Sequence, residues 1–347
     1  MSFFGKFFNN IIRNRDAKDD TPQVTVVKQK PPYYGTVTPY PNFNASSDAS
    51  VLKSAIESKG VDEDVISAIL VKRSNDQRQK IKVVYEASAG KTLEAALKKA
   101  LKSHYEDICL GLLMTPAQFD AHLFRKATHG LGTHEHILVE ILATRSNQEI
   151  QEMKRVFKEE YKKDLEDVIK SETSGDFTKA LLAMLKANRD ESTDVDMALA
   201  QKDAKTLFEA GEHCKGTNVE AFIDILTTRS KPQLSKTFQE YARIGNNTLP
   251  KALQLELKGD IEDCLIDIVK CAWNTPAFFA EKLHHAMKRL GTNEDTLTRV
   301  LVSRSEVDLK KIIDEYQGMF SISLHDHIKK ETSGHYGKIL LALLGSN

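Results

Sequence analysis

The chain has 347 residues, of which 41% are apolar and 28% charged, so it can form several compact units and bury their cores. No uninterrupted apolar run exceeds six residues, whereas a helix needs roughly 20 to cross a bilayer, so a membrane-spanning helix is excluded. The N-terminus also lacks the continuous apolar segment of a secretory signal peptide, and we therefore predict a cytosolic protein.

The charge is balanced overall but unevenly distributed. There are 49 basic and 49 acidic residues, and residues 1–30 hold six of the basic and three of the acidic ones. The slightly acidic remainder has no net attraction for phosphate-rich partners. We therefore expect no nucleic-acid partner, and binding to anionic lipid would need a local basic patch or a bridging cation.

Residues 1–45 differ from the rest of the chain. Phenylalanine and isoleucine recur at helical spacing over residues 3–12, with Lys6, Arg13 and Arg15 around them, which predicts a basic amphipathic helix. The proline-rich segment that follows, 31–41, predicts an extended linker.

An internal repeat dominates residues 46–347. Four similar segments occur, and each carries a glycine followed thirteen residues later by an arginine. The segments are KGVDEDVISAILVKRS, LGTHEHILVEILATRS, KGTNVEAFIDILTTRS and LGTNEDTLTRVLVSRS. The glycine–arginine pairs are Gly60 and Arg73, Gly132 and Arg145, Gly216 and Arg229, and Gly291 and Arg304. We place the units at 46–114, 115–186, 202–274 and 275–347, with a polar linker at 187–201.

Each unit shows five apolar clusters at helical spacing and no alternating strand pattern. Helix-start signals support the helical interpretation. They are the capping-box pairs Ser74 and Gln77, Ser146 and Glu149, Ser230 and Gln233, and Ser305 and Asp308, and the N-caps Thr115 and Thr275, each followed by proline. The predicted fold is therefore all-α, with four repeats of five short helices.

A glycine-bearing loop and a distant acid recur together in three of the four units. Forty residues after the loop glycine stand Glu172, Glu256 and Glu331, each followed by glycine three residues later, whereas the first unit has Ala100 there. Glycine-rich turns at helix ends expose backbone carbonyls, and a carboxylate would complete an all-oxygen site. Such a ligand set favours Ca²⁺ over Mg²⁺ or Zn²⁺, and it leaves coordination positions for water or a lipid phosphate.

The repeats resemble the annexin family over roughly residues 35–347, through segments such as KGVDE, TPAQFDA, ELKGDIE, KPQL and PAFFAEKLHHAMK. The resemblance implies a curved disc whose calcium loops dock onto anionic phospholipid. It also implies roles in membrane aggregation, exocytosis, phospholipase inhibition and anti-inflammatory signalling. A dimeric EF-hand protein is an implied partner of the N-terminal helix. Peripheral membrane attachment when calcium rises is expected, with nuclear or signal-peptide-independent exported pools as further locations.

The resemblance also assigns metal ligands by position. Three full sites would use the carbonyls of Thr128, Gly130 and Gly132 with Glu172, those of Gly211, Cys214 and Gly216 with Glu256, and those of Met287, Arg289 and Gly291 with Glu331. Two smaller sites in the first unit would use Gly60, Val61 and Glu63, and Lys98, Leu101 and Glu106.

Three other interpretations compete with this one. The histidines His104, His122, His129, His134 and His136 could serve acid–base catalysis, but no hydrolase, metalloprotease or P-loop motif accompanies them, so we predict no enzyme. A helical-repeat scaffold could bind a protein partner independently of calcium. The N-terminal apolar stripe could pack onto the repeats, lie in another protein's groove, or contact a membrane.

The four cysteines lack metal or disulfide spacing and are predicted to be buried: Cys109, Cys214, Cys264 and Cys271.

Overall fold

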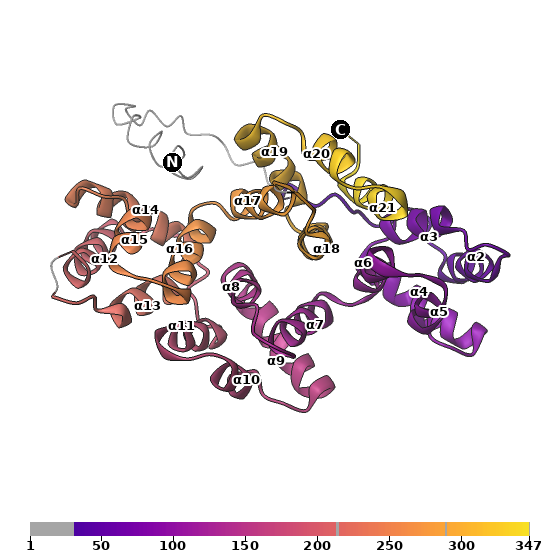
Figure 1. The fold of residues 1–347 in the computed structure, drawn as a ribbon, viewed down its shortest axis with the longest axis horizontal. Coiled ribbons are helices and arrows are strands. Elements are labelled where there is room, and N and C mark those ends of the chain that lie inside the picture. The colour runs from indigo at the N-terminus through magenta and orange to yellow at the C-terminus, as the bar shows by residue number, and fades with distance from the viewer. Residues whose placement is uncertain (1–30, 213–214, 289, 347) are drawn as a thin grey trace.

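The computed structural model describes residues 31–212, 215–288 and 290–346, and the amphipathic helix predicted in the first 30 residues lies outside them. The described residues form helices α2 to α21 and contain no β-strand (Figure 1). Five helices fall in each repeat, which confirms the predicted all-α class. Among the described residues, no helix is both long and apolar enough to cross a bilayer.

The helices follow one another in the same order in every repeat. Repeat 1 holds α2 (Ala45–Glu57), α3 (Glu63–Val71), α4 (Asn75–Ala89), α5 (Leu93–Ala100) and α6 (Ser103–Leu113). Repeat 2 holds α7 (Pro116–Thr128), α8 (Glu135–Thr144), α9 (Asn147–Tyr161), α10 (Leu165–Glu172) and α11 (Gly175–Leu185). Repeat 3 holds α12 (Met197–Ala210), α13 (Val219–Thr228), α14 (Lys231–Ile244), α15 (Leu249–Glu256) and α16 (Asp260–Trp273). Repeat 4 holds α17 (Thr275–Met287), α18 (Glu294–Arg304), α19 (Leu309–Phe320), α20 (Leu324–Glu331) and α21 (Gly334–Leu344).

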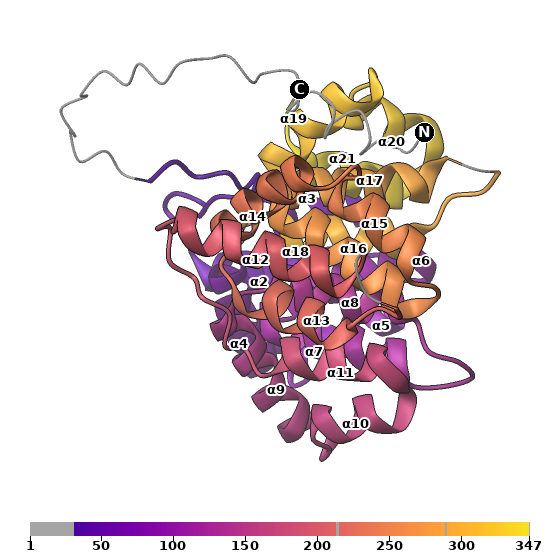
Figure 2. The ribbon, with the colours of Figure 1, turned by 90° about the vertical axis from the view of Figure 1, so that its left-hand side faces the viewer.

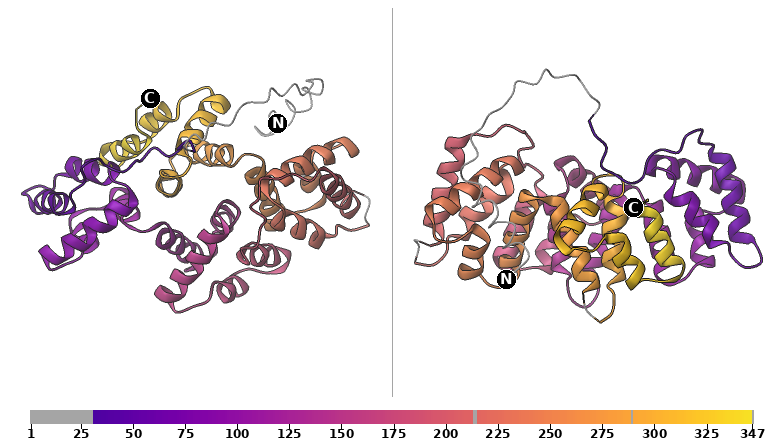
Figure 3. Two further views of the ribbon diagram at one scale, coloured as in Figure 1. Left: turned by 180° about the vertical axis from the view of Figure 1, so that it is seen from behind. Right: turned by 90° about the horizontal axis from the view of Figure 1, so that it is seen from above.

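The repeats pack in two pairs. Repeats 1 and 4 meet through α3, α6, α18 and α21, and repeats 2 and 3 meet through the corresponding helices α8, α11, α13 and α16. The chain therefore closes on itself, with its last repeat against its first. Seen from above, repeat 4 lies between repeats 1 and 3, so the four units form the predicted curved disc (Figure 3).

An arginine joins the first two helices of each of the first three repeats, and it is buried in repeats 1 and 2 and partly exposed in repeat 3. The arginine thirteen residues after the loop glycine binds an aspartate of the repeat's first helix, with N–O distances of 2.6–2.8 Å. The pairs are Arg73 and Asp48, Arg145 and Asp120, and Arg229 and Asp203. Repeat 4 differs, because Phe279 stands at the aspartate position of α17. Arg304 lies over that ring and binds Asp308 instead, at 2.7 Å.

This substitution explains why one predicted capping box is wrong. Asp308 accepts hydrogen bonds from Arg304 instead of pairing with Ser305. Ser305 directly follows α18 and donates to the Val302 carbonyl. Helix α19 therefore begins only at Leu309. The Thr275 cap is also misplaced by one residue. Asn274 caps α17, and the Thr275 hydroxyl donates to the carbonyl of Cys271. The boxes predicted at the start of α4 and α9 are confirmed.

In each of two linkers, residues 31–44 and 187–201, the backbone is hydrogen-bonded to a glutamine side chain. The Gln77 side chain exchanges hydrogen bonds with the backbone of Tyr40, and the Gln233 side chain does so with Asp196. Residues 31–44 thus cross from repeat 4 to repeat 1, and their backbone also bonds to Ser305. Figure 2 shows this linker on one face of the disc, opposite the loops that follow α7 and α17.

The cysteines of the described residues are structural. Cys109, Cys264 and Cys271 are free thiols with at most 1% exposure, which confirms the prediction for these three, while Cys214 lies outside the described residues. Burial raises the pKa of all three thiols, to about 12 for Cys109 and Cys271, so they remain protonated and inert at neutral pH.

Candidate functional site

In each repeat, a loop with a sharp turn at its glycine connects the first helix to the second. The loop glycines of repeats 1 to 4 have φ values between +87° and +95°, in the left-handed region that favours glycine. A backbone hydrogen bond of 2.9 Å closes each loop onto the last turn of the preceding helix. The glycines are Gly60, Gly132, Gly216 and Gly291. The loop-closing donors are the amides of Asp62, His134, Asn218 and Asn293.

The distant acids lie beside these loops in the three repeats where the sequence predicts them. The loop threonine that follows the glycine reaches the glutamate 39 residues further along the chain. Thr133 is 3.5 Å from a carboxylate oxygen of Glu172, and Thr217 donates to the Glu256 carboxylate at 3.0 Å. In repeat 4, Thr292 donates to the backbone carbonyl of Glu331 at 3.2 Å. The forty-residue offset thus corresponds to a contact between two loops.

Repeat 2 shows the predicted ligand set most completely. Thr128 ends α7, Gly130 has φ +120°, and Glu172 ends α10 with its side chain exposed. Within the described residues, no hydrogen bond is recorded to the carbonyl oxygens of Thr128, Gly130 or Gly132. The contact of Thr133 with Glu172 brings the carboxylate beside this loop.

Repeats 3 and 4 have the same frame with partial descriptions. Gly211 follows α12, and Met287 is the last residue of α17. Their backbone thus starts the loop at the position of Thr128 in repeat 2. The other predicted ligands, Cys214 and Arg289, lie outside the described residues.

Repeat 1 lacks the distant acid, and its loop has other partners. The Gly60 carbonyl accepts a hydrogen bond from the Ser58 hydroxyl at 2.7 Å, and the Glu63 carboxylate lies 3.5 Å from His335 of repeat 4. At the second loop, Leu101 is a buried C-cap, while Lys98 and Glu106 lie on the flanking helices α5 and α6. Val61, between the two first-loop positions, packs partly buried against the core.

The sequence analysis missed the loop tips. Leu131 and Leu290, the residues directly before the loop glycines of repeats 2 and 4, are fully exposed, at 107% and 108% of the reference area. Repeats 1 and 3 carry Lys59 and Lys215 at the same position. The available signal was a leucine directly before the loop glycine in two of the four repeats.

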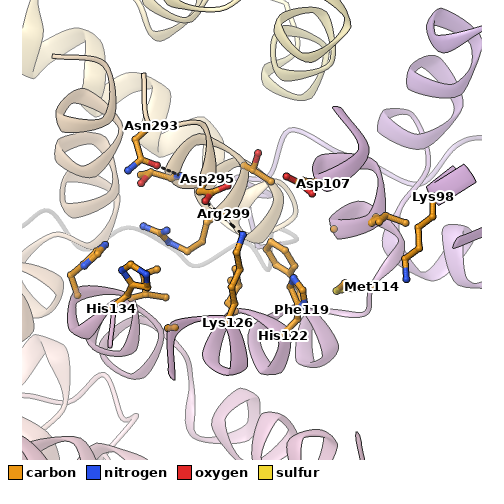
Figure 4. Close-up of a pocket in the computed structure, with 18 residues that line it drawn as sticks. Lys98, Asp107, Met114, Phe119, His122, Lys126, His134, Asn293, Asp295 and Arg299 are labelled. Carbon is orange, nitrogen blue, oxygen red and sulfur yellow. Dashed lines mark hydrogen bonds and ion pairs between the residues drawn. The ribbon is translucent and has the colours of Figure 1, made fainter. Parts of the chain in front are cut away.

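Three of the five histidines considered as catalytic groups line a cavity. The cavity, of about 360 Å³, lies between repeats 1, 2 and 4, and His122, His134 and His136 are among its lining residues (Figure 4). Desolvation lowers the pKa of His136 to about 4, with Lys282 and Arg299 adding to the shift, and desolvation also lowers the pKa of His122. Both imidazoles are therefore neutral at neutral pH.

Comparison with known proteins places the chain in a family. The family model described as Annexin matches residues 47–112, 119–184, 202–268 and 278–343, one match in each repeat. The chain belongs to the annexin family. Calcium-dependent binding to anionic phospholipid is the general property of annexins, and they are generally not enzymes.

Individual annexins match nearly the whole chain. Annexin A1 of Rattus norvegicus is 55% identical over 311 residues, 90% of each chain, which confirms the resemblance to the annexin family. The structure of annexin III superimposes with a TM-score of 0.89 at 45% identity and covers 91% of this chain and 98% of its own. A calcium-bound annexin (Sm)1 matches with a TM-score of 0.81 at 30% identity, covering 90% and 93%.

Proposed function

We propose that this annexin binds Ca²⁺ at the loops of repeats 2, 3 and 4 and through it attaches reversibly to anionic phospholipid. The observation that carries the proposal is the contact between each loop threonine and the distant glutamate. The full sites would use Thr128, Gly130, Gly132 and Glu172; Gly211, Cys214, Gly216 and Glu256; and Met287, Arg289, Gly291 and Glu331.

The chemistry of these ligands supports Ca²⁺. Carbonyl and carboxylate oxygens are hard ligands, and Ca²⁺ accepts six to eight of them in flexible geometry. Three carbonyls and one glutamate leave the shell incomplete. A lipid phosphate oxygen that fills a remaining position would be bound through the metal, which lets a protein without net positive charge bind an anionic surface. The solved calcium-bound annexin (Sm)1 adds a precedent on the same fold.

The exposed loop tips add a second kind of contact. Leu131 and Leu290 stand beside two of the proposed sites, where their side chains would enter the headgroup region. In repeat 1, we propose smaller sites at Gly60, Val61 and Glu63, and at Lys98, Leu101 and Glu106. These lack a forty-residue acid and are expected to be weaker.

The finer functional assignments follow from the resemblance. They are membrane aggregation, exocytosis, phospholipase inhibition by covering the lipid substrate, and anti-inflammatory signalling. The N-terminal amphipathic segment would bind a dimeric EF-hand protein. We place the protein in the cytoplasm and on membranes when calcium rises, with nuclear and exported pools as further destinations.

Co-sedimentation with phosphatidylserine vesicles across a calcium titration tests the proposal. The variant Glu172→Gln, Glu256→Gln, Glu331→Gln should need at least about tenfold more calcium for half-maximal binding, because carboxylate ligands set the affinity of calcium sites. The control variant Glu86→Gln, Glu152→Gln, Glu160→Gln removes three exposed charges elsewhere and should bind as the wild type does.

Two outcomes would contradict the proposal. One is an equal calcium response in the two triple variants, which would show that Glu172, Glu256 and Glu331 are not calcium ligands. The other is vesicle binding that persists in excess chelator, or no vesicle binding at any calcium concentration. Stable, calcium-independent binding to a protein partner, together with no lipid affinity, would favour the scaffold interpretation.

A further inference from the structure

The interface between repeats 1 and 4 contains two related histidine sites. His104 of α6 and His335 of α21 each stand 44 residues after the loop glycine of their own repeat. Each ring faces an acid at the start of the second helix of the other repeat. His104 lies 3.8 Å from Glu294 of α18, and His335 lies 3.5 Å from Glu63 of α3. The two halves of the interface thus repeat one arrangement.

One helical turn further on, the two halves differ in charge. Lys338 follows His335 by three residues and lies 3.6 Å from Asp64, so a cation of the chain neutralises that acid. Asp107 occupies the equivalent position after His104. This half therefore places two carboxylates on the facing helices, and the cation that pairs with Asp295 comes from repeat 2, as Lys126 at 3.6 Å. Figure 4 shows Asp107 of α6 and Asp295 of α18 on facing sides of the gap.

The three side chains converge on one point. One ligand atom from each of His104, Asp107 and Asp295 lies within 4.8 Å of the others. The ligand atoms of a tetrahedral zinc site lie about 2.1 Å from the ion and so about 3.4 Å from each other. All three side chains are solvent-accessible, His104 at 45%, so each can close on an ion by moving about 1 Å.

We propose that His104, Asp107 and Asp295 bind a divalent transition-metal ion of the Zn²⁺ type between repeats 1 and 4. An imidazole nitrogen with two carboxylate oxygens matches the ligand preference of Zn²⁺, and water would take the fourth position. The ion pair of Lys126 with Asp295, at 3.6 Å, opens on binding, and it is exposed enough to do so at little cost.

The proposed site borders the loop of repeat 4, because His104 and Asp295 line one pocket with Gly291, but its ligand chemistry differs from that of the calcium loops. It contains a nitrogen ligand, which Ca²⁺ does not favour, so saturating calcium should leave it available. It also joins α6 to α18, and its occupation would tie the first repeat to the last. Spacing along the sequence could not reveal it, because two ligands come from repeat 1 and the third is 188 residues further along the chain.

Calorimetric titration of the full chain with zinc chloride in saturating calcium tests the proposal. We expect one zinc ion per chain and a rise in Tm on binding. His104→Gln and Asp107→Lys should each weaken zinc binding by more than about tenfold, since even the outer-shell partners of metal ligands contribute 10- to 100-fold. The charge-reversal control is Asp64→Lys, at the position equivalent to Asp295, and it should keep the wild-type affinity.

The control separates ligation from general electrostatics. An equal loss of affinity in Asp64→Lys and Asp107→Lys would overturn the proposal, and so would unchanged zinc binding in both ligand variants. Circular dichroism of each variant verifies that it is folded. A zinc-dependent rise in Tm that is present in the wild type and in Asp64→Lys, and absent from both ligand variants, supports the metal bridge.

Discussion

At the scale of single residues, one backbone position shows how the repeats diverged. In repeats 2 to 4 a glycine stands where the last helix of the repeat begins, with φ between +66° and +75°. Gly175 and Gly334 are the first residues of α11 and α21, and Gly259 directly precedes α16. Repeat 1 has Ser103 there and keeps the turn, with φ +58°. The left-handed conformation disfavours residues with a Cβ, so repeat 1, which has neither the glycine nor the distant acid, adopts the same turn under strain.

Gly175→Ser tests the strain at this position. An added Cβ at Gly175 meets no atom within 4 Å, so only the backbone conformation opposes it. We expect the free energy of unfolding to fall by about 1 kcal/mol in urea denaturation. Gly318→Ser, in the middle of α19 and equally open, should show no loss. Equal stability of the two variants would contradict the strain.

At the scale of helices, the buried arginines fix the first helix of a repeat to the second. Arg145 and Asp120 are 2% and 6% exposed, and two hydrogen bonds join them between α7 and α8. The loop with the proposed calcium ligands connects these same two helices. The ion pair lies at the ends of these helices that are remote from the loop, and it fixes the packing of the two helices that carry the loop.

Asp120→Asn should be strongly destabilising. The change leaves the Arg145 charge buried without a counter-ion, and removal of one partner of a buried pair costs about 3–5 kcal/mol. Thermal unfolding followed by circular dichroism measures the loss. Glu220→Gln breaks the exposed pair with Lys179 and serves as the control, with an unchanged Tm expected. A Tm of Asp120→Asn equal to that of the control would show that the pair does not hold the helices together.

At the scale of the whole molecule, one ion pair joins the two pairs of repeats. Glu140 of α8 and Arg299 of α18 are 0% and 3% exposed and lie 2.7 Å apart, although 159 residues separate them. Burial alone would raise the pKa of Glu140, but the charge and hydrogen bonds of Arg299 hold it below its ordinary value of 4.5.

The lowered pKa of Glu140 predicts a pH dependence of stability. Because the folded state binds the proton more weakly than the unfolded state, the contribution is complete above pH about 4.5 and is lost as the pH falls through the folded-state pKa. Glu140→Gln should lower the free energy of unfolding by at least about 3 kcal/mol at neutral pH, and the difference from wild type should shrink in acid. Urea unfolding from neutral pH down to about pH 3 measures both. A pH-independent difference would contradict the assignment.

The sequence predicted repetition well because it is expressed in local spacing. Apolar periodicity identified the five helices per repeat, and the offset to Glu172, Glu256 and Glu331 was enough to place each acid near its loop. Local spacing could not show which residues bind the arginines that follow the loop glycines by thirteen residues. The aspartate partners lie 25 or 26 residues earlier along the chain, and Asp120 gives no periodic signal of its own.

Predictions from local spacing failed where a residue of another helix changed the hydrogen-bond partner of a side chain. Ser305 and Asp308 have capping-box spacing, yet Asp308 serves Arg304 because Phe279 replaced the aspartate of α17. The juxtaposition of His104 with Asp295 was invisible for a different reason. It depends on closure of the first repeat onto the last, which spacing within one repeat does not encode.

The placement of the linker has a consequence for orientation. Residues 31–44 run along the face away from the loops after α7 and α17 (Figure 2). If those loops rest on a vesicle, residues 31–44 lie on the opposite side of the protein, toward bulk water. A molecule bound in this way is oriented: one side contacts the bilayer, and the other side presents residues 31–44 to molecules in solution.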